Sequence, residues 1–571
     1  MWKYRVMPSP VDRDGPDGPA EDRDDLDGMT DVADLVEAAA AQSPDKLAIV
    51  EAGGRSLTWA QLDDEVGRVA TGLGAAGIVA GHRVMVAMGN RIEFVTTYLG
   101  ILRAQAVAVP VNPRATAGEL ARMLADSGAR MVVTDVDTVR AVREAAAIIA
   151  RALDPEGGTD DTEGSAADQE GRLDPDLVDR AVQPRVVAVG ATLLPGERSY
   201  DHLRADTARP VPPLQDPEKL AALLYTSGTS GRPRAAMLTH RALLANIAQV
   251  ARVEPPMIHG DDVVLGVLPL FHVYGLNAVL GGVMRHRAKL VLVDRFDPQG
   301  TLDLIEDEAC SVVPVAPPVF AYWRGEEQLK ERLGPVRLML SGSAPLSPEL
   351  IDEFTAATEI PVHQGYGLTE AAPVVTSTLI SEHLQSGSVG AALPGIGLRL
   401  VDDSGRPPEG EDPGEIQIRG ANLFSGYWPD GDDGPDAEGW WSTGDVGFLD
   451  ATGDLFLVDR LKELVIVSGF NVYPVEVEDV IREVDGVAEA AVIGVEDPLT
   501  GEAVVAYVRA PGADPAVVEG AVREHCERRL ARFKQPSRVE VVEELPLTVT
   551  GKVQKGRLRG MERRRALGLL E

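Results

Sequence analysis

Residues 225–234, which read YTSGTSGRPR, combine hydroxyl side chains, glycines and arginines that could bind phosphate. Hydroxyl side chains and two glycines follow an apolar run, Leu220–Tyr225, that predicts a buried strand. Glycine lets backbone N–H groups approach an anion, and arginine adds forked, charged donors. We expect phosphate contacts from Thr226, Ser227, Gly228, Thr229, Ser230, Gly231 and Arg234. For this segment alone, a polar surface turn is the alternative interpretation.

The segment is not the common nucleotide loop G-x-x-x-x-G-K-[ST], because Gly228 and Gly231 stand too close together. Further motifs follow in order: SGSAPL (341–346), QGYGLTE (364–370), STGD (442–445), DRLKELVIVSGFNVYPVEVE (459–478) and TGKVQK (550–555). Together they resemble the signatures of the adenylate-forming superfamily, which includes acyl-CoA synthetases, aryl-CoA ligases, luciferases and peptide-synthetase adenylation domains. The resemblance covers about residues 30–560.

This resemblance implies that the chain joins a carboxylic acid to the α-phosphate of ATP and releases pyrophosphate. It also implies an adenine pocket, to which the motifs contribute Gly342, Ala344, Gly365, Tyr366 and Gly367. The glycines would allow close backbone approach, and the Tyr366 ring would offer a stacking face for a base. Taken alone, SGSAP is only a tight turn, so its place in the motif order decides this interpretation.

Glu370 is the single carboxylate of a glycine-rich loop. A hard cation that bridges phosphates needs only one or two protein oxygens besides water. The resemblance places the Mg²⁺ ligand at Glu370 and a phosphate contact at Thr369. It assigns the ribose hydroxyls to Asp445, with Arg460 beside it, although an isolated Gly-Asp pair is usually a turn.

Lys552 lies far in sequence from the phosphate-binding segment. By resemblance it is the catalytic lysine, whose charge would contact both the acid's carboxylate and the α-phosphate while the bond forms. A lysine near a C-terminus is ordinarily solvated, and we expect that of Lys555.

LPLFHVYG (268–275) resembles the segment that lines the acyl pocket in this superfamily. It contains no carboxylate that would hold the amino group of an amino-acid substrate, as peptide-synthetase domains do. His272 resembles the histidine that gates entry of the acid, and a packed histidine is the alternative. VSGFNVYPVEVE (467–478) matches CoA ligases, in which Gly469 lies beside the pantetheine tunnel, so the expected acceptor is the thiol of coenzyme A.

The chain departs from the superfamily pattern directly after the phosphate-binding segment. Where Pro-Lys-Gly is usual, it has Pro233-Arg234-Ala235. Arginine keeps the positive charge but changes the geometry of the donors. Arg234 is therefore expected to contact phosphate differently from the usual lysine.

Composition limits the classes of partner. The 571 residues carry a net charge of −34, which argues against nucleic-acid or anionic-membrane partners. Cys310 and Cys526 are the two cysteines, and Cys526 shares an apolar helix face with Val518 and Val522. The lack of an apolar bilayer-length run or a hydrophobic leader, with so few thiols, predicts a cytoplasmic protein.

Alternating strand and helix patterns predict an α/β fold. We expect a large N-terminal domain of parallel sheets layered with helices and a smaller, mobile α+β C-terminal domain. The predicted boundaries are a disordered acidic tail at 1–28, an adenylation domain with the ATP and acyl sites at 29–459, and a mobile domain at 460–571. The hinge is expected at 459–462, centred on Lys462, and 154–176 is expected to be a surface loop.

Gly72, Gly74 and Gly77 spell a G-x-G-x-x-G, the dinucleotide fingerprint. That fingerprint needs a strand before it and a helix after it. Here the pattern predicts a helix from Thr58, opened by a capping box with Gln61, and a strand at 82–88 after the glycines. The match is therefore interpreted as a chance one.

These observations predict a fatty-acid–CoA ligase that uses ATP, Mg²⁺ and coenzyme A and forms an acyl-AMP intermediate. An aryl-CoA ligase and an acyl-AMP ligase that loads a carrier protein are the alternatives. A catalytically inactive nucleotide-binding regulator would be expected to lack Lys552 or Glu370, and both are present.

Overall fold

A computed structural model describes the chain at residues 26, 28–154, 173–226, 233–344, 346, 348–402, 405–408, 412–460, 463–467, 470–497, 500–548 and 551–566. Most of the predicted acidic tail, 1–28, lies outside these residues, as do 155–172 of the predicted surface loop. At the end of that loop, Pro175–Val178 forms the short helix α7.

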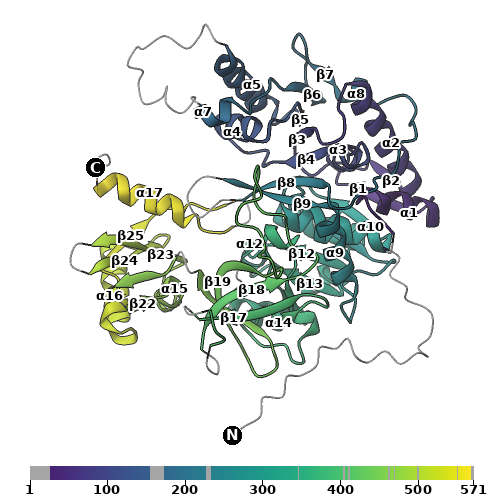
Figure 1. Cartoon of the computed structure of the whole chain (residues 1–571). Coiled ribbons are helices and arrows are strands. Elements are labelled where there is room, and N and C mark those ends of the chain that lie inside the picture. Colours follow the sequence, from purple (N-terminus) through teal and green to yellow (C-terminus); the bar gives the residue numbers. More distant parts are fainter. Residues whose placement is uncertain are drawn as a thin grey trace.

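The first large sheet has seven strands in the order β7-β6-β5-β3-β4-β8-β9, and all its pairs are parallel except β8–β9. Its strands are β3 (Arg83–Ala87), β4 (Val107–Pro110), β5 (Met131–Asp135), β6 (Arg185–Val189), β7 (Arg198–Ser199), β8 (Leu220–Thr226) and β9 (Arg234–Thr239). The helices of this part of the chain are α2 (Trp59–Ala75), α3 (Ile92–Arg103), α4 (Ala117–Ser127), α5 (Val139–Leu153) and α8 (Tyr200–Leu203). Figure 1 shows them around the upper sheet.

The second large sheet also has seven strands, in the order β14-β13-β12-β10-β11-β1-β2, and only the β1–β2 pair is antiparallel. Its strands are β1 (Leu47–Glu51), β2 (Ser56–Thr58), β10 (Val263–Gly266), β11 (Lys289–Leu292), β12 (Val312–Val315), β13 (Leu338–Ser341) and β14 (Val362–Gln364). The associated helices are α1 (Asp34–Gln42), α9 (His240–Ala251), the π-helix η2 (Tyr274–Gly281), α10 (Gly282–His286), α11 (Pro298–Asp307), α12 (Pro318–Tyr322), α13 (Leu329–Arg332) and α14 (Pro348–Thr358).

Smaller β structures follow. Two short 3₁₀ helices, η3 (Thr369–Ala371) and η4 (Thr378–Ile380), flank β15 (Thr376–Ser377), which pairs with β16 (Ala391–Ala392). An antiparallel four-stranded sheet then comprises β17 (Gly397–Val401), β18 (Gly414–Arg419), β19 (Trp441–Leu449) and β20 (Leu455–Arg460).

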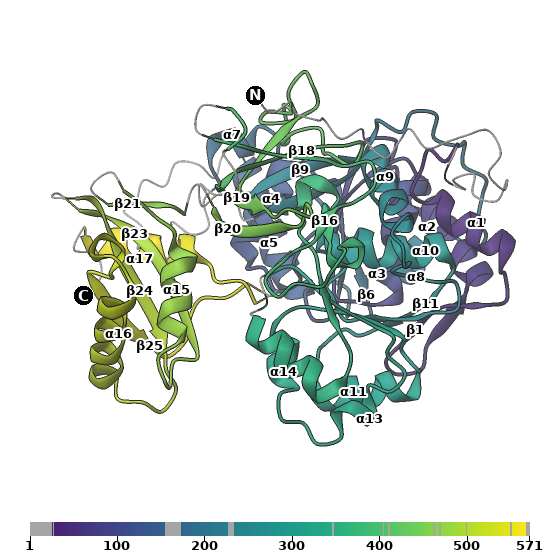
Figure 2. The same ribbon diagram turned by 90° about the horizontal axis from the view of Figure 1, so that it is seen from below.

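The C-terminal domain is a separate α+β unit that lies beside the rest of the chain in Figure 2. It contains β21 (Val465–Val467), β22 (Phe470–Val472), α15 (Pro474–Arg482), β23 (Glu489–Asp497), β24 (Gly501–Arg509), α16 (Pro515–Arg529), η5 (Arg532–Lys534), β25 (Arg538–Val542) and α17 (Lys555–Ala566). The predicted fold class, a large domain of parallel sheets and a smaller α+β domain, is confirmed.

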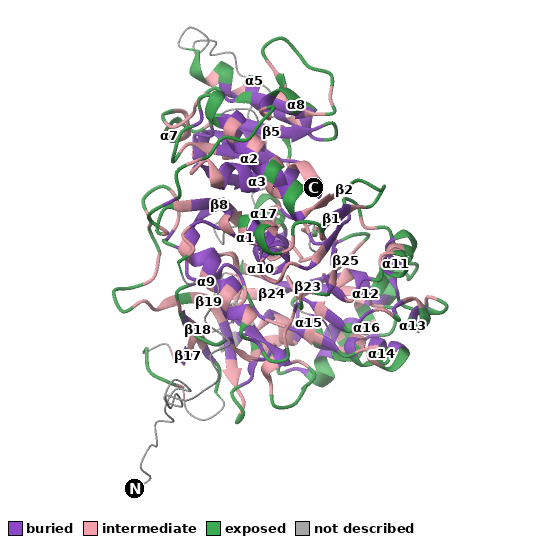
Figure 3. Ribbon diagram, turned by 90° about the vertical axis from the view of Figure 1, so that its right-hand side faces the viewer, coloured by how far each residue is buried: buried purple, intermediate pink, exposed green. Residues whose placement is uncertain are grey.

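Helix α2 shows how local sequence and packing agree. Thr58 and Gln61 form the predicted capping box, and the apolar face of the helix is fully buried. Figure 3 shows buried residues concentrated along α2, α3 and the strands of the first sheet. Two glycines of the G-x-G-x-x-G, Gly72 and Gly74, lie within α2, and β3 follows the third, so the predicted order of helix and strand is confirmed and the fingerprint's required strand-before, helix-after context is absent.

Two expectations about the C-terminal domain have opposite outcomes. Cys526 is buried with Val518 and Val522 in the core of this domain, as predicted. Lys555, expected to be solvated, is instead buried, with its Nζ 2.8 Å from Glu478 Oε1 and 3.1 Å from Glu463 Oε2. The expectation was wrong because a buried lysine needs acidic partners, and these come from sequence-distant parts of the domain.

Candidate active site

The predicted phosphate-binding segment joins β8 to β9. Thr226 is the last residue of β8, and its hydroxyl donates to the backbone oxygen of Arg234, the first residue of β9, at 3.3 Å. Ser227, Gly228, Thr229, Ser230 and Gly231 lie outside the described residues, so their contacts stay predictions.

Gly342 directly follows β13, at the carboxyl edge of the second sheet. Its backbone N–H donates to Val315 O at 3.3 Å. A β-carbon at this position would lie 2.6 Å from Cε1 of Tyr274, so the Tyr274 ring requires a glycine here. The structure thereby brings the first predicted adenine-pocket motif against the predicted acyl-pocket segment. Ala344 lies two residues further on and is half-buried.

Gly365 and Gly367 pack against the segment 373–376, which returns alongside them. A β-carbon at Gly365 would lie 2.5 Å from Thr376 O, and one at Gly367 would overlap Pro373 O. This close packing explains why both positions need glycine, which could not be inferred from the sequence.

Tyr366 and Asp445 come together although they lie 79 residues apart in sequence. The Tyr366 hydroxyl donates to Asp445 Oδ2 at 2.6 Å. Asp445 on β19 is also the register partner of Arg460 on β20, which places the two backbones side by side as predicted. Tyr366, predicted to contact adenine, is thus hydrogen-bonded to Asp445, predicted to contact ribose.

Glu370 lies in η3, directly after Thr369, and only 8% of its surface is exposed. Its Oε1 accepts a 2.6 Å hydrogen bond from the hydroxyl of Tyr427, and its backbone oxygen accepts one from Phe424 N at 2.9 Å. A buried carboxylate needs such donors, because an unpaired charge in the interior is costly.

Three buried asparagines hold the loop that follows Glu370. Asn422 Nδ2 donates to Ala371 O at 2.7 Å, and Asn277 Nδ2 donates to Ala372 O at 2.7 Å. Asn246 exchanges two bonds with the backbone of Val374, at 2.8 and 3.0 Å. These asparagines were missed in the sequence. For Asn246 and Asn277 the available signal was a polar residue inside an apolar helical run, as in ANIAQVA and GLNAVLG.

Arg234 has two neighbours on the segment before β19. Its Cζ lies 3.8 Å from the centroid of the Tyr427 ring, and its Nη1 lies 2.8 Å from Asp433 Oδ2. Neither Tyr427 nor Asp433 was predicted, because neither belongs to a motif used in the sequence interpretation.

Lys552 lies in a tight turn of the C-terminal domain. Its backbone N–H donates to Thr548 Oγ1 at 3.0 Å, and Thr548 N donates back to Lys552 O at 2.7 Å. A β-carbon on the neighbouring Gly551 would overlap the ring of Pro318, at the start of α12. Because α12 follows β12, this contact brings the lysine turn to the sheet edge where Gly342 lies.

His272 precedes η2, and its Nδ1 accepts a 3.3 Å hydrogen bond from the backbone of Tyr274. Burial lowers the pKa of His272 to about 4, so the ring is neutral at pH 7. A neutral imidazole that accepts at Nδ1 carries its proton on Nε2.

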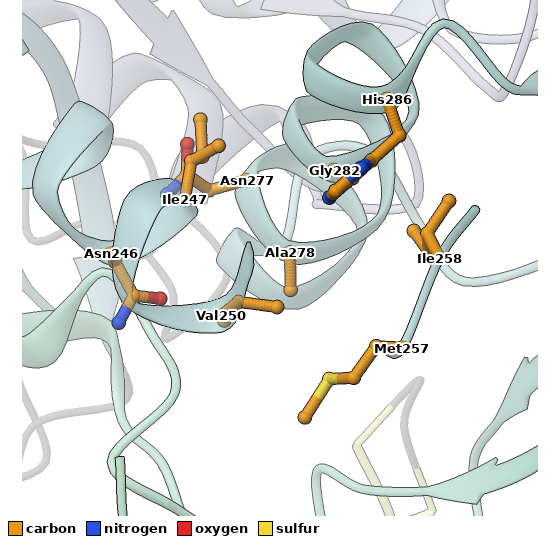
Figure 4. A pocket seen from close by; sticks show the side chains of 9 residues that line it. All are labelled: Asn246, Ile247, Val250, Met257, Ile258, Asn277, Ala278, Gly282 and His286. Carbon is orange, nitrogen blue, oxygen red and sulfur yellow. The ribbon is translucent and has the colours of Figure 1, made fainter. Parts of the chain in front are cut away.

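A small cavity of about 10 Å³ lies along α9, η2 and α10 (Figure 4). It is lined by Asn246, Ile247, Val250, Met257, Ile258, Asn277, Ala278, Gly282 and His286. Burial, together with the charges of Arg285 and Arg287, lowers the pKa of His286 to about 4, so this lining is uncharged at pH 7. None of the described residues that line the cavity is a phenylalanine, tyrosine or tryptophan.

Lys462 and Gly469 lie outside the described residues, as does the side chain of Arg460. The predicted hinge and CoA tunnel therefore stay predictions. Within the described part of the chain, no cluster of three or more His, Cys, Asp or Glu side chains is placed to hold a metal ion. Glu370 remains a fitting partial site, because a buried carboxylate supplies the oxygen ligand that Mg²⁺ prefers when phosphates complete its coordination.

Comparison with known proteins identifies the family. Residues 36–428 match the AMP-binding enzyme family, and residues 476–552 match its C-terminal domain. The chain belongs to the AMP-binding enzyme family.

Similar members are CoA ligases for different acids. This AMP-binding enzyme is 33% identical to 4-coumarate–CoA ligase 5 of Oryza sativa subsp. japonica, over 89% of this chain and 90% of that one. It is 32% identical to the long-chain-fatty-acid–CoA ligase of Escherichia coli O157:H7, over 92% and 94% of the two chains. The crystal structure of ATP-bound MatB from Rhodopseudomonas palustris superimposes with a TM-score of 0.79 at 31% identity, covering 93% and 99%.

The family and these relatives support acid–CoA ligation through an acyl adenylate, with ATP and coenzyme A as substrates. They include both aryl-acid and fatty-acid ligases, so they do not distinguish the two substrate classes. In the part of this AMP-binding enzyme that the structure describes, no helix combines the length and apolar character needed to cross a membrane.

Proposed function

We propose that this AMP-binding enzyme is a fatty-acid–CoA ligase. In the first step the acid's carboxylate attacks the α-phosphate of ATP, which forms acyl-AMP and releases pyrophosphate. In the second step the thiol of coenzyme A attacks the acyl carbon, which forms the thioester and releases AMP. The proposal rests on the shape of the acyl site, since the family and its relatives support acid–CoA ligation in general.

The observation that carries the proposal is a row of residues along one face of η2 and α10. Tyr274, Ala278, Gly282 and His286 are spaced four residues apart. Tyr274 contacts Gly342 at the sheet edge, and the other three line the cavity of Figure 4. The helix therefore runs from the predicted reaction site to a small, uncharged, mainly aliphatic cavity.

The lining is closely packed at Gly282. A β-carbon at Gly282 would lie 2.9 Å from Cδ1 of Ile258, so even one added carbon would crowd the lining. Ile247, Val250, Met257 and Ile258 supply aliphatic surface, which suits the methylene groups of an alkyl chain. A flat ring would instead be favoured by stacking faces, and the described lining offers none.

The nucleotide would be held by the residues that converge around Tyr366 and Asp445. In this proposal the 226–231 segment and Arg234 bind the phosphates, the motifs at Gly342 and Gly365 surround adenine, and Asp445 binds the ribose. Mg²⁺, held by Glu370 and the phosphates, would neutralise phosphate charge. Lys552 would contact the acid's carboxylate and the α-phosphate, and the packing of its neighbour Gly551 against Pro318 supports this role.

We also propose that residues 29–459 form the adenylation domain and 460–571 a mobile domain, hinged near Lys462. The separate matches at 36–428 and 476–552 support two units. Rotation about the hinge would remove the Lys552 turn and bring the predicted tunnel at Gly469 to the acyl-AMP.

The test is acid preference in the wild type and in Ala278→Phe. Hexadecanoic, hexanoic and cinnamic acids are supplied with ATP, Mg²⁺ and coenzyme A, and the thioester is measured by mass. Wild type should prefer hexadecanoic acid. Ala278→Phe should lower kcat/KM for hexadecanoic acid by about tenfold or more and change hexanoic acid far less, because it fills only the distal space.

Ala357→Phe, on the exposed surface of α14, is the matched control and should leave all three acids unchanged. A wild-type preference for cinnamic acid would contradict the proposal and favour an aryl-CoA ligase. Accumulation of acyl-AMP that coenzyme A does not consume would favour a ligase that loads a carrier protein.

A further inference from the structure

Tyr427 connects two residues that belong to different motifs. Its hydroxyl donates to Glu370 Oε1 at 2.6 Å, and the Arg234 guanidinium lies over its ring at 3.8 Å from the centroid. Glu370 is the predicted Mg²⁺ ligand, and Arg234 follows the predicted phosphate-binding segment. One side chain therefore contacts the groups expected to hold the metal and the phosphates.

The backbone around Tyr427 is itself fixed to β9, the strand that Arg234 begins. Trp428 N donates to Ala235 O at 2.8 Å, and Met237 N donates to Gly426 O at 3.1 Å. Gly426 adopts a φ of +91°, and a β-carbon there would overlap Gly431 O. The segment behaves as a short extra strand on the edge of the first sheet, which gives Tyr427 a defined place.

Packing holds the Tyr427 ring as well. Phe424 lies edge-on at 5.0 Å between ring centroids. Asp433 forms an ion pair of 2.8 Å with Arg234, although 69% of the Asp433 side chain is exposed. An exposed pair of this kind contributes little stability.

The hydrogen bond has a clear direction. The Tyr427 hydroxyl donates and the Glu370 carboxylate accepts, because an ionised carboxylate has no proton to give. Glu370 is nearly buried, and a donor on Oε1 limits rotation of the carboxylate. The same carboxylate would have to present oxygen to a cation that tolerates only a narrow geometry.

We propose that Tyr427 is a positioning residue for metal-bound ATP: it orients Glu370 through its hydroxyl and Arg234 through its ring. This inference rests on the proposed function for the identity of the nucleotide. Tyr427 has two separate effects: its hydroxyl orients Glu370, the predicted metal ligand, and its ring orients Arg234, the predicted phosphate contact.

Tyr427→Phe separates them experimentally, because it removes the hydroxyl and keeps the ring. ATP binding is measured by calorimetry with excess Mg²⁺ and again in EDTA. Loss of a hydrogen bond to a charged acceptor should weaken binding with Mg²⁺ by about tenfold and leave binding in EDTA within about twofold. The Mg²⁺ concentration that half-activates pyrophosphate exchange should rise by about the same factor.

Tyr427→Leu removes the ring as well and should weaken binding of ATP under both conditions. Asp433→Asn, at an exposed position, should weaken both a few-fold without changing their ratio. Tyr322→Phe, at a tyrosine that is 63% exposed, is the matched control and should change neither.

The proposal is overturned if Tyr427→Phe leaves Mg²⁺-dependent binding unchanged, or if it weakens binding equally with and without Mg²⁺. A shifted Mg²⁺ dependence for Asp433→Asn would also overturn the division of roles. The calorimetric measurements need no acid, unlike the pyrophosphate-exchange assay. An enzyme that binds ATP as described but activates no fatty acid would therefore contradict the proposed substrate, and leave the role of Tyr427 standing.

Discussion

The fold controls the protonation of His272, which lies in the predicted acyl-pocket segment. Its Nδ1 accepts from the backbone of Tyr274, and burial lowers its pKa from 6.5 to about 4. In the unfolded chain the same ring would titrate near 6.5. The folded protein therefore binds fewer protons than the unfolded chain between these two values.

Stability should consequently be highest above about pH 6.5 and should fall as the pH drops toward 4, because protons favour the unfolded chain. At pH 5 the contribution of His272 should be a loss of about 1–2 kcal/mol in the free energy of unfolding. His272→Gln should flatten this part of the profile, as measured by urea unfolding between pH 7 and pH 5.

His202→Gln, at an exposed histidine in α8, is the matched control and should keep the wild-type slope. An unchanged slope in His272→Gln would show that His272 is not held neutral by burial. His286, whose pKa is also lowered to about 4, would then be the residue to substitute next.

Site residues could be predicted from sequence where they belong to a motif. They could not be predicted where only a long-range contact places them in the site. Thr226, Gly342, Tyr366, Glu370 and Asp445 follow from short, ordered motifs. Their partners could not be inferred, because the hydrogen bonds join residues far apart in sequence: 57 residues for Tyr427 and Glu370 and 128 for Asn246 and Val374. Roles in binding ATP stay predictions.

Helix α2 carries a packing constraint that its glycines reveal. A β-carbon at Gly72 would overlap the backbone oxygen of Leu203, at the end of α8, whereas nothing lies within 4 Å of one at Gly74. The glycines of the chance fingerprint thus differ in their surroundings, although they stand two residues apart in one helix.

Gly72→Ala should lower the free energy of unfolding by about 1–3 kcal/mol, because the added methyl group forces α2 away from α8. Gly74→Ala should instead raise it by roughly 0.5 kcal/mol, because alanine favours an open helix position. Urea unfolding measures both. ATP affinity should be unchanged in Gly74→Ala, and a large loss there would mean that the fingerprint binds nucleotide after all.

Helices and strands could be predicted where the apolar pattern of the sequence is long and depends on neighbouring residues alone. The periodic apolar face and capping box of α2, and the alternation from β3 to β5, could be derived from sequence. The strands β17 to β20 could not be paired into a sheet in advance, because short antiparallel strands owe their structure to neighbours. The π-helical turns of η2 were equally unforeseen, since apolar periodicity does not distinguish i→i+5 from i→i+4 bonding.

The two domains meet at the turn that carries Lys552. Gly551 packs on Pro318 of the large domain. Within the small domain, Lys555 at the N-terminal end of α17 forms ion pairs with Glu463 and Glu478. The turn that carries Lys552 is thus fixed to one domain and packs against the other. Such a contact can be released as a unit if the domain rotates about a hinge.

The two half-reactions should therefore respond to different substitutions. Lys552→Ala removes a charge that would act in the transition state for adenylation, an effect of typically a hundred- to a thousandfold. It should reduce pyrophosphate release and leave thioester formation from supplied acyl-AMP nearly intact. Gly469→Leu adds bulk at the predicted pantetheine tunnel, so it should spare acyl-AMP formation and block transfer to coenzyme A. If both variants slowed both steps equally, domain rotation would be the wrong mechanism for this enzyme.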